Sequence, residues 1–160
     1  MTIESMTVDD IAQVAEIERQ IFSIPWSEKA FRDSMESDNT IYIVAKENDN
    51  VAGYAGMYLS FEEGNITNVA VNPLSRRKGI GEKIVRDILN RAYEKGVRDV
   101  FLEVRETNSV AIALYEKIGF KEEGIRKNFY DKPRENALIM WKHNPVSYTH
   151  LRAHETRSNL

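Results

Sequence analysis

The sequence has no cysteine among its 160 residues, only four prolines and only three histidines. The missing cysteine excludes disulfide bonds, a thiol nucleophile and thiolate metal sites. His143 is the only histidine outside residues 146–160, so no metal site is predicted. The lack of cysteine is compatible with a reducing cytoplasm, where we expect the protein to act.

Long apolar stretches and an excess of positive charge are also missing. No apolar run approaches the roughly 20 residues that a membrane-spanning helix needs, and the acidic start MTIESMTVDD lacks the apolar core of a secretory signal. The net charge of −3 gives no general affinity for nucleic acid or for anionic membranes. We expect one globular domain, a monomer or weak dimer, with neither nucleic acid nor a membrane as its partner.

The last stretch of the chain differs in composition from the rest. Residues 146–160 (VSYTHLRAHETRSNL) show no periodicity and hold two of the three histidines. The stretch resembles a translated sequencing adapter, and the alternative is a genuine disordered tail. We therefore expect the domain to span residues 1–145 and exclude residues 146–160 from the prediction of the fold.

The first half of the chain predicts a strand, two helices and then an antiparallel meander. A strand is expected over residues 2–6, and apolar residues follow helical spacing over residues 8–21. Ser27 is a suitable N-cap for a short helix that runs to about Met35. Three β-branched and aromatic runs follow, separated by the turns DN and EEGN. They cover residues 40–47, 51–61 and 66–73.

The second half predicts two helices that alternate with strands. A helix is expected over residues 79–95, with Gly96 as its stop. Its apolar stripe consists of Ile80, Ile84, Val85, Ile88, Leu89 and Ala92. A buried strand, a short helix that ends at Gly119 and two further strands follow, over residues 98–106, 108–120, 120–130 and 135–142. The order β-α-α-β-β-β-α-β-α-β-β indicates a layered α/β domain with a mixed, mostly antiparallel sheet flanked by helices.

The stretch RRKGIG stands between the third strand of the meander and the following helix. Glycine allows a backbone to approach a ligand closely, and the first N–H groups of a helix favour an anion. Arg76, Arg77 and Lys78 add positive charge before Gly79 and Gly81. The pattern predicts a phosphate site, and the alternative is an ordinary strand-to-helix turn with a solvated basic run.

Two other phosphate motifs fit poorly. A Walker loop, G-x-x-x-x-G-K-[ST], does not occur in the sequence. A dinucleotide fingerprint requires a third glycine, but Ile84 stands in that position. The elements before the glycines are also a meander and not the first strand of a βαβ unit, so a nucleotide-binding regulatory domain is disfavoured.

Two further side chains are candidates for chemistry. Glu103 lies within the apolar run VFLEV, where a carboxylate must be near water, a cation or a substrate. The alternative is a residue at an edge that pairs with Arg105 on the same face. Tyr115 lies on the helical stripe that faces the sheet, where it is either a proton donor or an aromatic core residue. The residues alone leave both questions open.

The segments NVAVNPLSRRKGIGEKIV and LEVRETNSVAIALYEKIGF together resemble the GCN5-related N-acetyltransferase (GNAT) superfamily, whose cofactor motif is [RQ]-x-x-G-x-[GA] after a strand. With IPWSEKAF, IRKNFY and ENALIM they resemble its bacterial ribosomal-protein-alanine N-acetyltransferases of the RimI type. The resemblance covers Ile3 to about Lys142. It implies acetyl-CoA as co-substrate and the N-terminal alanine of a small-subunit ribosomal protein as acceptor.

The resemblance also implies a role for individual residues. The cofactor arm would lie along one strand, with its pyrophosphate on the glycine turn and one further contact at the next helix start. The implied cofactor-binding residues are Val69, Ala70, Val71, Arg76, Arg77, Lys78, Gly79, Ile80, Gly81, Glu82 and Asn108. Glu82 and Asn108 also have ordinary interpretations, as an acidic first-turn residue and as an N-cap.

For catalysis, the resemblance implies Glu103 as general base, directly or through a water, and Tyr115 as general acid. Transfer would be direct, in a ternary complex, because the chain has no cysteine and no G-x-S-x-G elbow. Pro25, Trp26 and Tyr130 would contact the acceptor peptide, unless they serve only for packing and strand capping. The alternatives are a lysine or small-amine acetyltransferase on the same fold, and a non-catalytic acyl-CoA-binding module.

Overall fold

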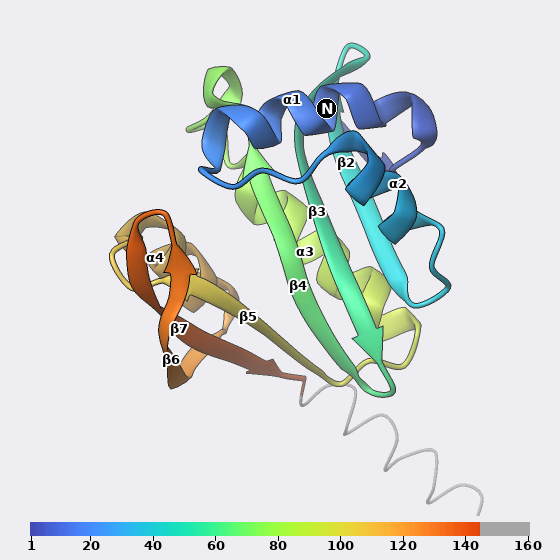
Figure 1. The fold of residues 1–160 in the computed structure, drawn as a ribbon. Helices are drawn as coiled ribbons and strands as arrows, with labels where there is room; N and C mark the ends of the chain where they lie inside the picture. The colour runs from blue at the N-terminus through green and yellow to red at the C-terminus, as the bar shows by residue number, and fades with distance from the viewer. Residues whose placement is uncertain (145–160) are drawn as a thin grey trace, which may run out of the picture.

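The computed structural model describes residues 1–144, and the tail predicted over residues 146–160 lies outside the described residues. A seven-stranded sheet runs in the order β1-β2-β3-β4-β5-β7-β6 (Figure 1). Its strands are β1 (Thr2–Ser5), β2 (Thr40–Glu47), β3 (Asn50–Ser60), β4 (Glu63–Val71), β5 (Asp99–Arg105), β6 (Lys121–Asp131) and β7 (Arg134–His143). The helices are α1 (Ile11–Ile21), α2 (Glu28–Met35), α3 (Ile80–Glu94) and α4 (Ser109–Ile118), with single 3-10 turns at Val8–Asp10 and Pro73–Ser75.

The predicted order of helices and strands is confirmed, although several predicted boundaries differ, among them the start of β4. We place a turn over EEGN, residues 62–65, whereas β4 begins at Glu63. The reason is pairing on both sides, because Gly64 lies opposite Leu59 of β3 and opposite Val100 of β5. Glycine and asparagine, which favour turns in isolation, are held extended here by two neighbouring strands.

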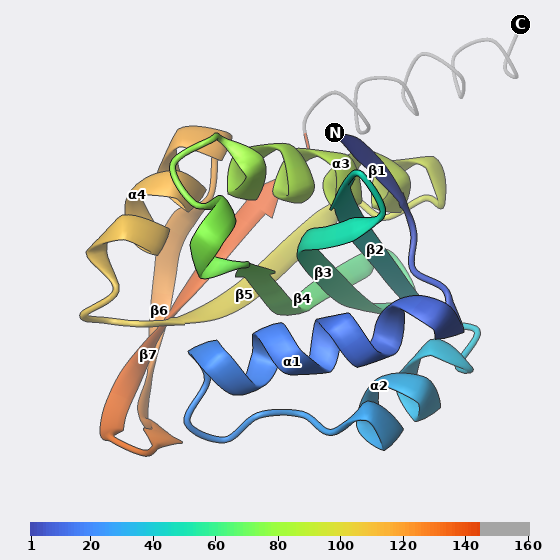
Figure 2. The same ribbon diagram turned by 90° about the horizontal axis from the view of Figure 1, so that it is seen from above.

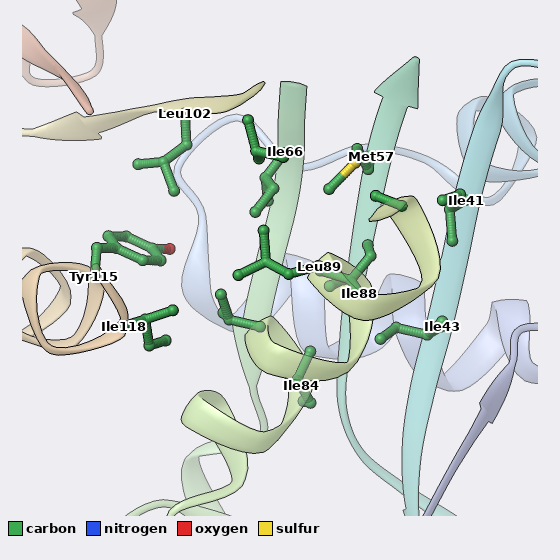
Figure 3. Packing of buried hydrophobic residues seen from close by; sticks show 14 of the residues in the cluster. Ile41, Ile43, Met57, Ile66, Ile84, Ile88, Leu89, Leu102, Tyr115 and Ile118 are labelled. Carbon is green, nitrogen blue, oxygen red and sulfur yellow. The ribbon is translucent and has the colours of Figure 1, made fainter. Parts of the chain in front are cut away.

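Helices cover both faces of the sheet. Figure 2 shows α3 and α4 on one face and α1 and α2 on the other. Ile84, Ile88 and Leu89 of α3 pack with Ile43 and Met57 of the sheet in one buried cluster (Figure 3). Burying each such side chain contributes roughly 1.5–3 kcal/mol. A second buried cluster joins α1 and α2 to the opposite face, so the sheet separates two apolar cores.

The helix ends follow the capping signals of the sequence. The Ser27 hydroxyl accepts a hydrogen bond from the Ala30 N–H at 3.1 Å and so caps α2. Gly96 and Gly119 follow α3 and α4 with φ of 92° and 116°, a conformation that costs glycine little. Both predicted stops are therefore confirmed. Among residues 1–144, no helix is long and apolar enough to cross a membrane.

The feature of the fold that matters most for function is the divergence of β4 and β5. The two strands pair in parallel only where residues 63–65 lie opposite residues 99–101. Beyond that point, within residues 1–144, β4 pairs only with β3, and β5 pairs only with β7. Figure 1 shows the two strands meeting at one end and separating toward the other. The facing edges of residues 66–71 and 102–105 therefore carry backbone groups that no neighbouring strand satisfies.

A histidine between two carboxylates joins the last strands at the other end of the sheet. His143 Nδ1 lies 2.6 Å from the Asp99 carboxylate and Nε2 lies 3.0 Å from that of Glu123. The hydrogen bond to Asp99, followed by that to Glu123, raises the pKa of His143 above its usual value. The imidazole therefore links β5, β6 and β7, and these contacts favour its protonated form.

This link predicts a pH-dependent part of the stability. Because the folded-state pKa is raised, the stabilisation is complete below the unfolded pKa of about 6.5 and is lost as the pH rises through the folded value. We expect the unfolding free energy of wild type to exceed that of His143→Gln below about pH 6.5, with the difference narrowing at alkaline pH. Urea unfolding across this range measures it. An NMR titration that places the imidazole pKa at or below the unfolded value would contradict the prediction.

Candidate active site

Glu103 lies on the separated part of β5. Its strand neighbours Leu102 and Val104 are buried in the cluster beneath α3. Side chains alternate along a strand, so the Glu103 carboxylate projects to the opposite face, the one that carries α1 and α2. The side chain is only 13% exposed. A carboxylate is thus held at the edge of the gap between β4 and β5, on one defined face.

The electrostatic surroundings of Glu103 suit a base. Burial raises the pKa of Glu103, and the charge of Arg126, whose Nε lies 3.6 Å from the carboxylate, opposes that shift. The alternative pairing with Arg105 is wrong, because the Arg105 guanidinium lies 3.2 Å from Glu135 instead. Arg126 is half exposed to solvent, which screens its charge. The carboxylate is therefore neither neutralised by a buried cation nor fully hydrated.

Tyr115 lies on the other face of the sheet. It is 8% exposed and belongs to the cluster beneath α3, with its ring 5.7 Å from that of Phe120. Figure 3 shows its hydroxyl pointing away from α4 toward the region between β5 and β4. Burial, and then the neighbouring Tyr130, raise the pKa of Tyr115 to about 12. The phenol is therefore protonated at neutral pH and able to donate a proton.

The glycine turn lies at the N-terminus of α3. Gly79 is the N-cap with φ 73°, no side chain among residues 1–144 caps the helix there, and a Cβ at Gly79 would have no neighbour within 4 Å. At Gly81 a Cβ would lie 3.6 Å from Val71 and 3.5 Å from Leu114. The turn thus faces open space on one side and reaches β4 and α4 on the other. Its first amides are available for an anion.

The charged residues of this turn divide into two groups. Arg76, Arg77 and Lys78 are exposed, and Lys78 lies 3.7 Å from Glu47. The Glu82 carboxylate instead contacts Lys117 at 2.8 Å and Arg86 at 2.9 Å. The hydrogen bond to Lys117, followed by that to Arg86, lowers the pKa of Glu82. The Glu82 side chain therefore joins α3 to α4, which leaves its backbone N–H for a ligand.

The remaining cofactor candidates lie on β4 and at the start of α4. Val69, Ala70 and Val71 pair with β3 on one side only, opposite Ala55, Tyr54 and Gly53. Asn108 caps α4, since its side-chain oxygen accepts from the Ala111 N–H at 3.2 Å. This contact corresponds to the ordinary interpretation of Asn108, and its amide NH₂ remains available for a further contact. Val69, Ala70 and Val71 thus lie on the free edge of β4 that leads to the glycine turn, whereas Asn108 lies at the start of α4.

The three residues expected to contact the acceptor lie on the face of Glu103. Pro25 is exposed in the connection between α1 and α2. Trp26 packs on Phe31 with ring centroids 5.3 Å apart. Burial, and then the charge of Glu103, raise the pKa of Tyr130 to about 12, so this phenol lies within electrostatic reach of the carboxylate.

Several residues around the site escape prediction from the sequence. Glu18 of α1 is 3% exposed and accepts hydrogen bonds from the Tyr54 hydroxyl and from the Trp26 N–H, the latter at 3.0 Å. For Glu18 the sequence does contain a clue to burial, because this charged residue falls on the apolar stripe of its helix, one turn after Val14. Arg105 and Glu135 pair across 30 residues of sequence, and no local pattern indicates that pair.

Comparison with known proteins decides the family. Residues 11–120 match the model of the Acetyltransferase (GNAT) family. The chain belongs to the GNAT family. Over 141 residues it is 35% identical to the [Ribosomal protein bS18]-alanine N-acetyltransferase of Escherichia coli K12, an alignment that covers 87% of this chain and 95% of that protein. The predicted resemblance to the superfamily and to its RimI-type members is thereby confirmed.

Solved structures agree with this assignment. The crystal structure of the ribosomal-protein-S18-alanine N-acetyltransferase from Escherichia coli superimposes with a TM-score of 0.82 at 33% identity, covering 89% of this chain and 92% of that one. The PaiA N-acetyltransferase of Thermoplasma acidophilum, solved with coenzyme A, shares the fold with a TM-score of 0.74 at 19% identity, covering 89% of this chain and 99% of that one. As a GNAT protein the chain is an N-acetyltransferase, and the GNAT family uses acetyl-CoA.

Proposed function

We propose that this GNAT enzyme acetylates a protein N-terminal α-amine, and that its acceptor is the N-terminal alanine of ribosomal protein bS18. One observation carries the proposal. A carboxylate and a protonated phenol flank the gap between β4 and β5 from opposite faces. The support for this acceptor is the 35% identity to the E. coli enzyme, over almost the whole of that protein.

The residues present fit acetyl-CoA as the acetyl donor. The amides at residues 79–82 have no helical partner and would hold the pyrophosphate, with Arg76, Arg77 and Lys78 adding charge. The free edge of β4 at Val69, Ala70 and Val71 would bind the pantetheine arm as a strand binds its neighbour. An N–H of this edge would also stabilise the negative charge on the thioester oxygen, typically by ~3 kcal/mol.

Acetyl transfer requires one proton acceptor and one proton donor, and the two flanking residues can fill these roles. The α-amine nitrogen forms a bond to the thioester carbon, and the carbon–sulfur bond breaks. Glu103 accepts the proton that the amine loses, directly or through a water, and Tyr115 donates a proton to the departing sulfur. An α-amine, with a pKa of about 7.7–8.0 against about 10.4 for lysine, reaches its free-base form more easily. This acceptor therefore demands less of its general base than a lysine would.

The Tyr115→Phe variant is expected to lower kcat by about 100-fold, because a positioned general acid typically contributes at least that factor. The KM for acetyl-CoA should change little, since the ring and its packing against Phe120 remain. The variant should also fold normally, because the substitution removes only the hydroxyl and leaves the buried ring in its contact with Phe120. Steady-state kinetics test this prediction, and a kcat equal to that of wild type would remove Tyr115 from the chemistry.

The acceptor is tested with matched peptides and mass spectrometry. One peptide begins with alanine and carries an internal lysine, and its partner has the same sequence with a blocked N-terminus. We expect one acetyl group on the α-amine of the first peptide and none on the second. Acetylation of the lysine, or of a small polyamine alone, would replace this function with the lysine or small-amine alternative. Binding of acetyl-CoA without any turnover would indicate a non-catalytic module.

A further inference from the structure

We propose that Arg105 is a positioning residue, which holds Tyr130 and the tip of the β6–β7 hairpin as a preformed wall of the acceptor site. The inference rests on the proposed function, in which Tyr130 faces the acceptor peptide. It adds a residue to which neither the sequence pattern nor the transfer chemistry gives a role. Arg105 lies two residues after Glu103, on the same face of β5.

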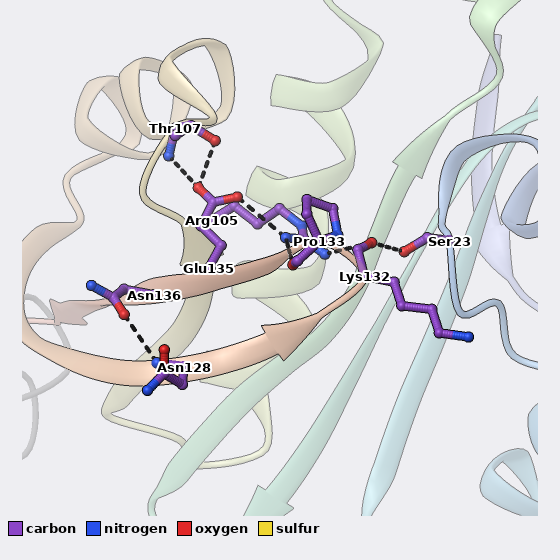
Figure 4. A network of polar contacts seen from close by, with 8 residues as sticks. All are labelled: Ser23, Arg105, Thr107, Asn128, Lys132, Pro133, Glu135 and Asn136. Carbon is purple, nitrogen blue, oxygen red and sulfur yellow. Dashed lines mark hydrogen bonds and ion pairs between the residues drawn. The ribbon is translucent and has the colours of Figure 1, made fainter.

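The guanidinium of Arg105 contacts three parts of the hairpin at once. It lies over the Tyr130 ring, 4.3 Å from the ring centroid. It donates hydrogen bonds to the carbonyl oxygens of Pro133 at 2.9 Å and of Lys132 at 3.4 Å. It also donates to the Glu135 carboxylate at 3.2 Å (Figure 4). Only the planar, multi-donor head of arginine makes such a set of contacts, and lysine does not reproduce it.

The hairpin tip needs such an anchor because its own strand pairing is interrupted. The register of β6 and β7 shifts between Arg126 and Tyr130, and Asn128 within this bulge has φ 54°. The Asn128 N–H bonds to the side chain of Asn136 at 2.9 Å rather than to a carbonyl of β7. Tyr130 therefore follows an irregular segment, and its place is fixed from β5 by Arg105.

The same network connects both sides of the acceptor site. The carboxylate of Glu135 accepts hydrogen bonds from the N–H, at 2.8 Å, and from the hydroxyl of Thr107, just before α4. On the other side, the Ser23 hydroxyl, in the connection that leads to Pro25 and Trp26, donates to the carbonyl of Lys132 (Figure 4). The anchored tip thus links the α1–α2 connection to the helix that carries Tyr115. Loss of Arg105 should loosen the wall as a unit.

This arrangement also explains why Arg105 does not pair with Glu103. Every polar contact of the guanidinium is directed at the hairpin, and its charge is balanced by Glu135. Among the residues that the structure describes, Glu103 keeps the half-exposed Arg126 as its one paired cation. The same contacts of Arg105 therefore position the hairpin tip and keep the guanidinium from forming an ion pair with Glu103.

The test compares Arg105→Lys and Arg105→Gln with wild type. Arg98→Gln serves as the matched control, because Arg98 precedes β5 at its opposite end and has a similar side-chain exposure, 30% against 27%. Two measurements are made on each protein: steady-state kinetics with the alanine-starting peptide and acetyl-CoA, and hydrogen–deuterium exchange resolved to residues 127–133.

In Arg105→Gln we expect the peptide KM to rise about tenfold or more, because charge-assisted hydrogen bonds are lost. We expect kcat to fall by less than about threefold, the KM for acetyl-CoA to stay unchanged, and exchange to accelerate at residues 127–133. Arg105→Lys, which keeps the charge, should show a smaller rise in the peptide KM, and Arg98→Gln should show none of these changes.

Two results would overturn the inference. One is unchanged exchange at the hairpin tip. The other is a loss of kcat or of acetyl-CoA affinity without a selective rise in the peptide KM. If Arg105→Gln fails to fold, the peptide KM and the exchange rates of Arg105→Lys are compared with those of wild type instead. A wild-type enzyme that leaves the alanine peptide unmodified would refute the proposed acceptor, and the exchange measurement would then still decide whether Arg105 holds the wall.

Discussion

The Glu103→Gln variant is expected to lower kcat/KM for the acceptor peptide by about 100- to 1,000-fold, the usual contribution of a positioned general base. Glutamine keeps the shape of the side chain but cannot accept the proton of the attacking amine. Binding of acetyl-CoA should be unaffected, since the proposed pyrophosphate site lies at the start of α3 and not on this face of β5. Peptide kinetics and calorimetry with acetyl-CoA measure the two effects separately.

The pH dependence provides a second test of the same residue. Because burial raises the pKa of Glu103, its carboxylate is protonated, and inactive as a base, at a higher pH than an ordinary glutamate. We expect the acidic limb of wild type to contain two protonations, that of the substrate α-amine and that of Glu103 at its raised pKa, and the residual activity of Glu103→Gln to keep only the first. Glu122→Gln, a change at an exposed carboxylate of β6, is the control. A limb in Glu103→Gln that still contains the second protonation, below that of the amine, would contradict the assignment.

The Gly79→Asp variant is expected to weaken acetyl-CoA binding by about 100-fold, because two negative charges about 4 Å apart repel by several kcal/mol at a partly solvated site. The carboxylate would lie where the unpaired amides of α3 are proposed to receive the pyrophosphate. Calorimetry with acetyl-CoA measures the dissociation constant. Folding should be preserved, because a Cβ at Gly79 meets nothing within 4 Å and a negative charge is favourable at a helix N-terminus.

Gly79→Asn is the matched control for this change. Asparagine and aspartate have nearly the same size, and both tolerate positive φ better than most residues, as the φ of 73° at this position requires. Only the charge distinguishes them. Equal weakening by both variants would mean that space or backbone conformation, and not an anion, explains the glycine. No weakening by the aspartate would remove the pyrophosphate from this turn.

Much of the fold follows from local patterns in the sequence. The stripe from Ile80 to Ala92 fixes α3, and Gly96 and Gly119 end their helices through positive φ. The strand predicted over residues 40–47 is β2. What the sequence leaves open depends on pairing between distant segments. The early start of β4 at Glu63 requires β5, which lies more than thirty residues later, and turn-forming residues conceal it.

The candidate site also contains features that local sequence predicts and features that depend on distant segments. The glycine turn and the isolated carboxylate at Glu103 carry local signals, because both violate the pattern of the element around them. The residues that lie opposite or pair with them carry no such local signal. The opposition of Glu103 and Tyr115 across the sheet follows from the separation of β4 and β5, a property of the whole fold. The pairing of Arg105 with Glu135 depends on the irregular hairpin, which has no sequence signature that we could identify.

The most direct test of the central claim is a crystal structure with a bisubstrate analogue, in which coenzyme A is joined through its sulfur to the α-nitrogen of an alanine-starting peptide. We predict that the pyrophosphate binds the amides of residues 79–82 and that the pantetheine arm pairs with the free edge of β4. The sulfur should lie beside the Tyr115 hydroxyl and the α-nitrogen on the Glu103 side. An analogue bound outside the gap between β4 and β5, or bound there with its nitrogen remote from Glu103, would contradict the claim.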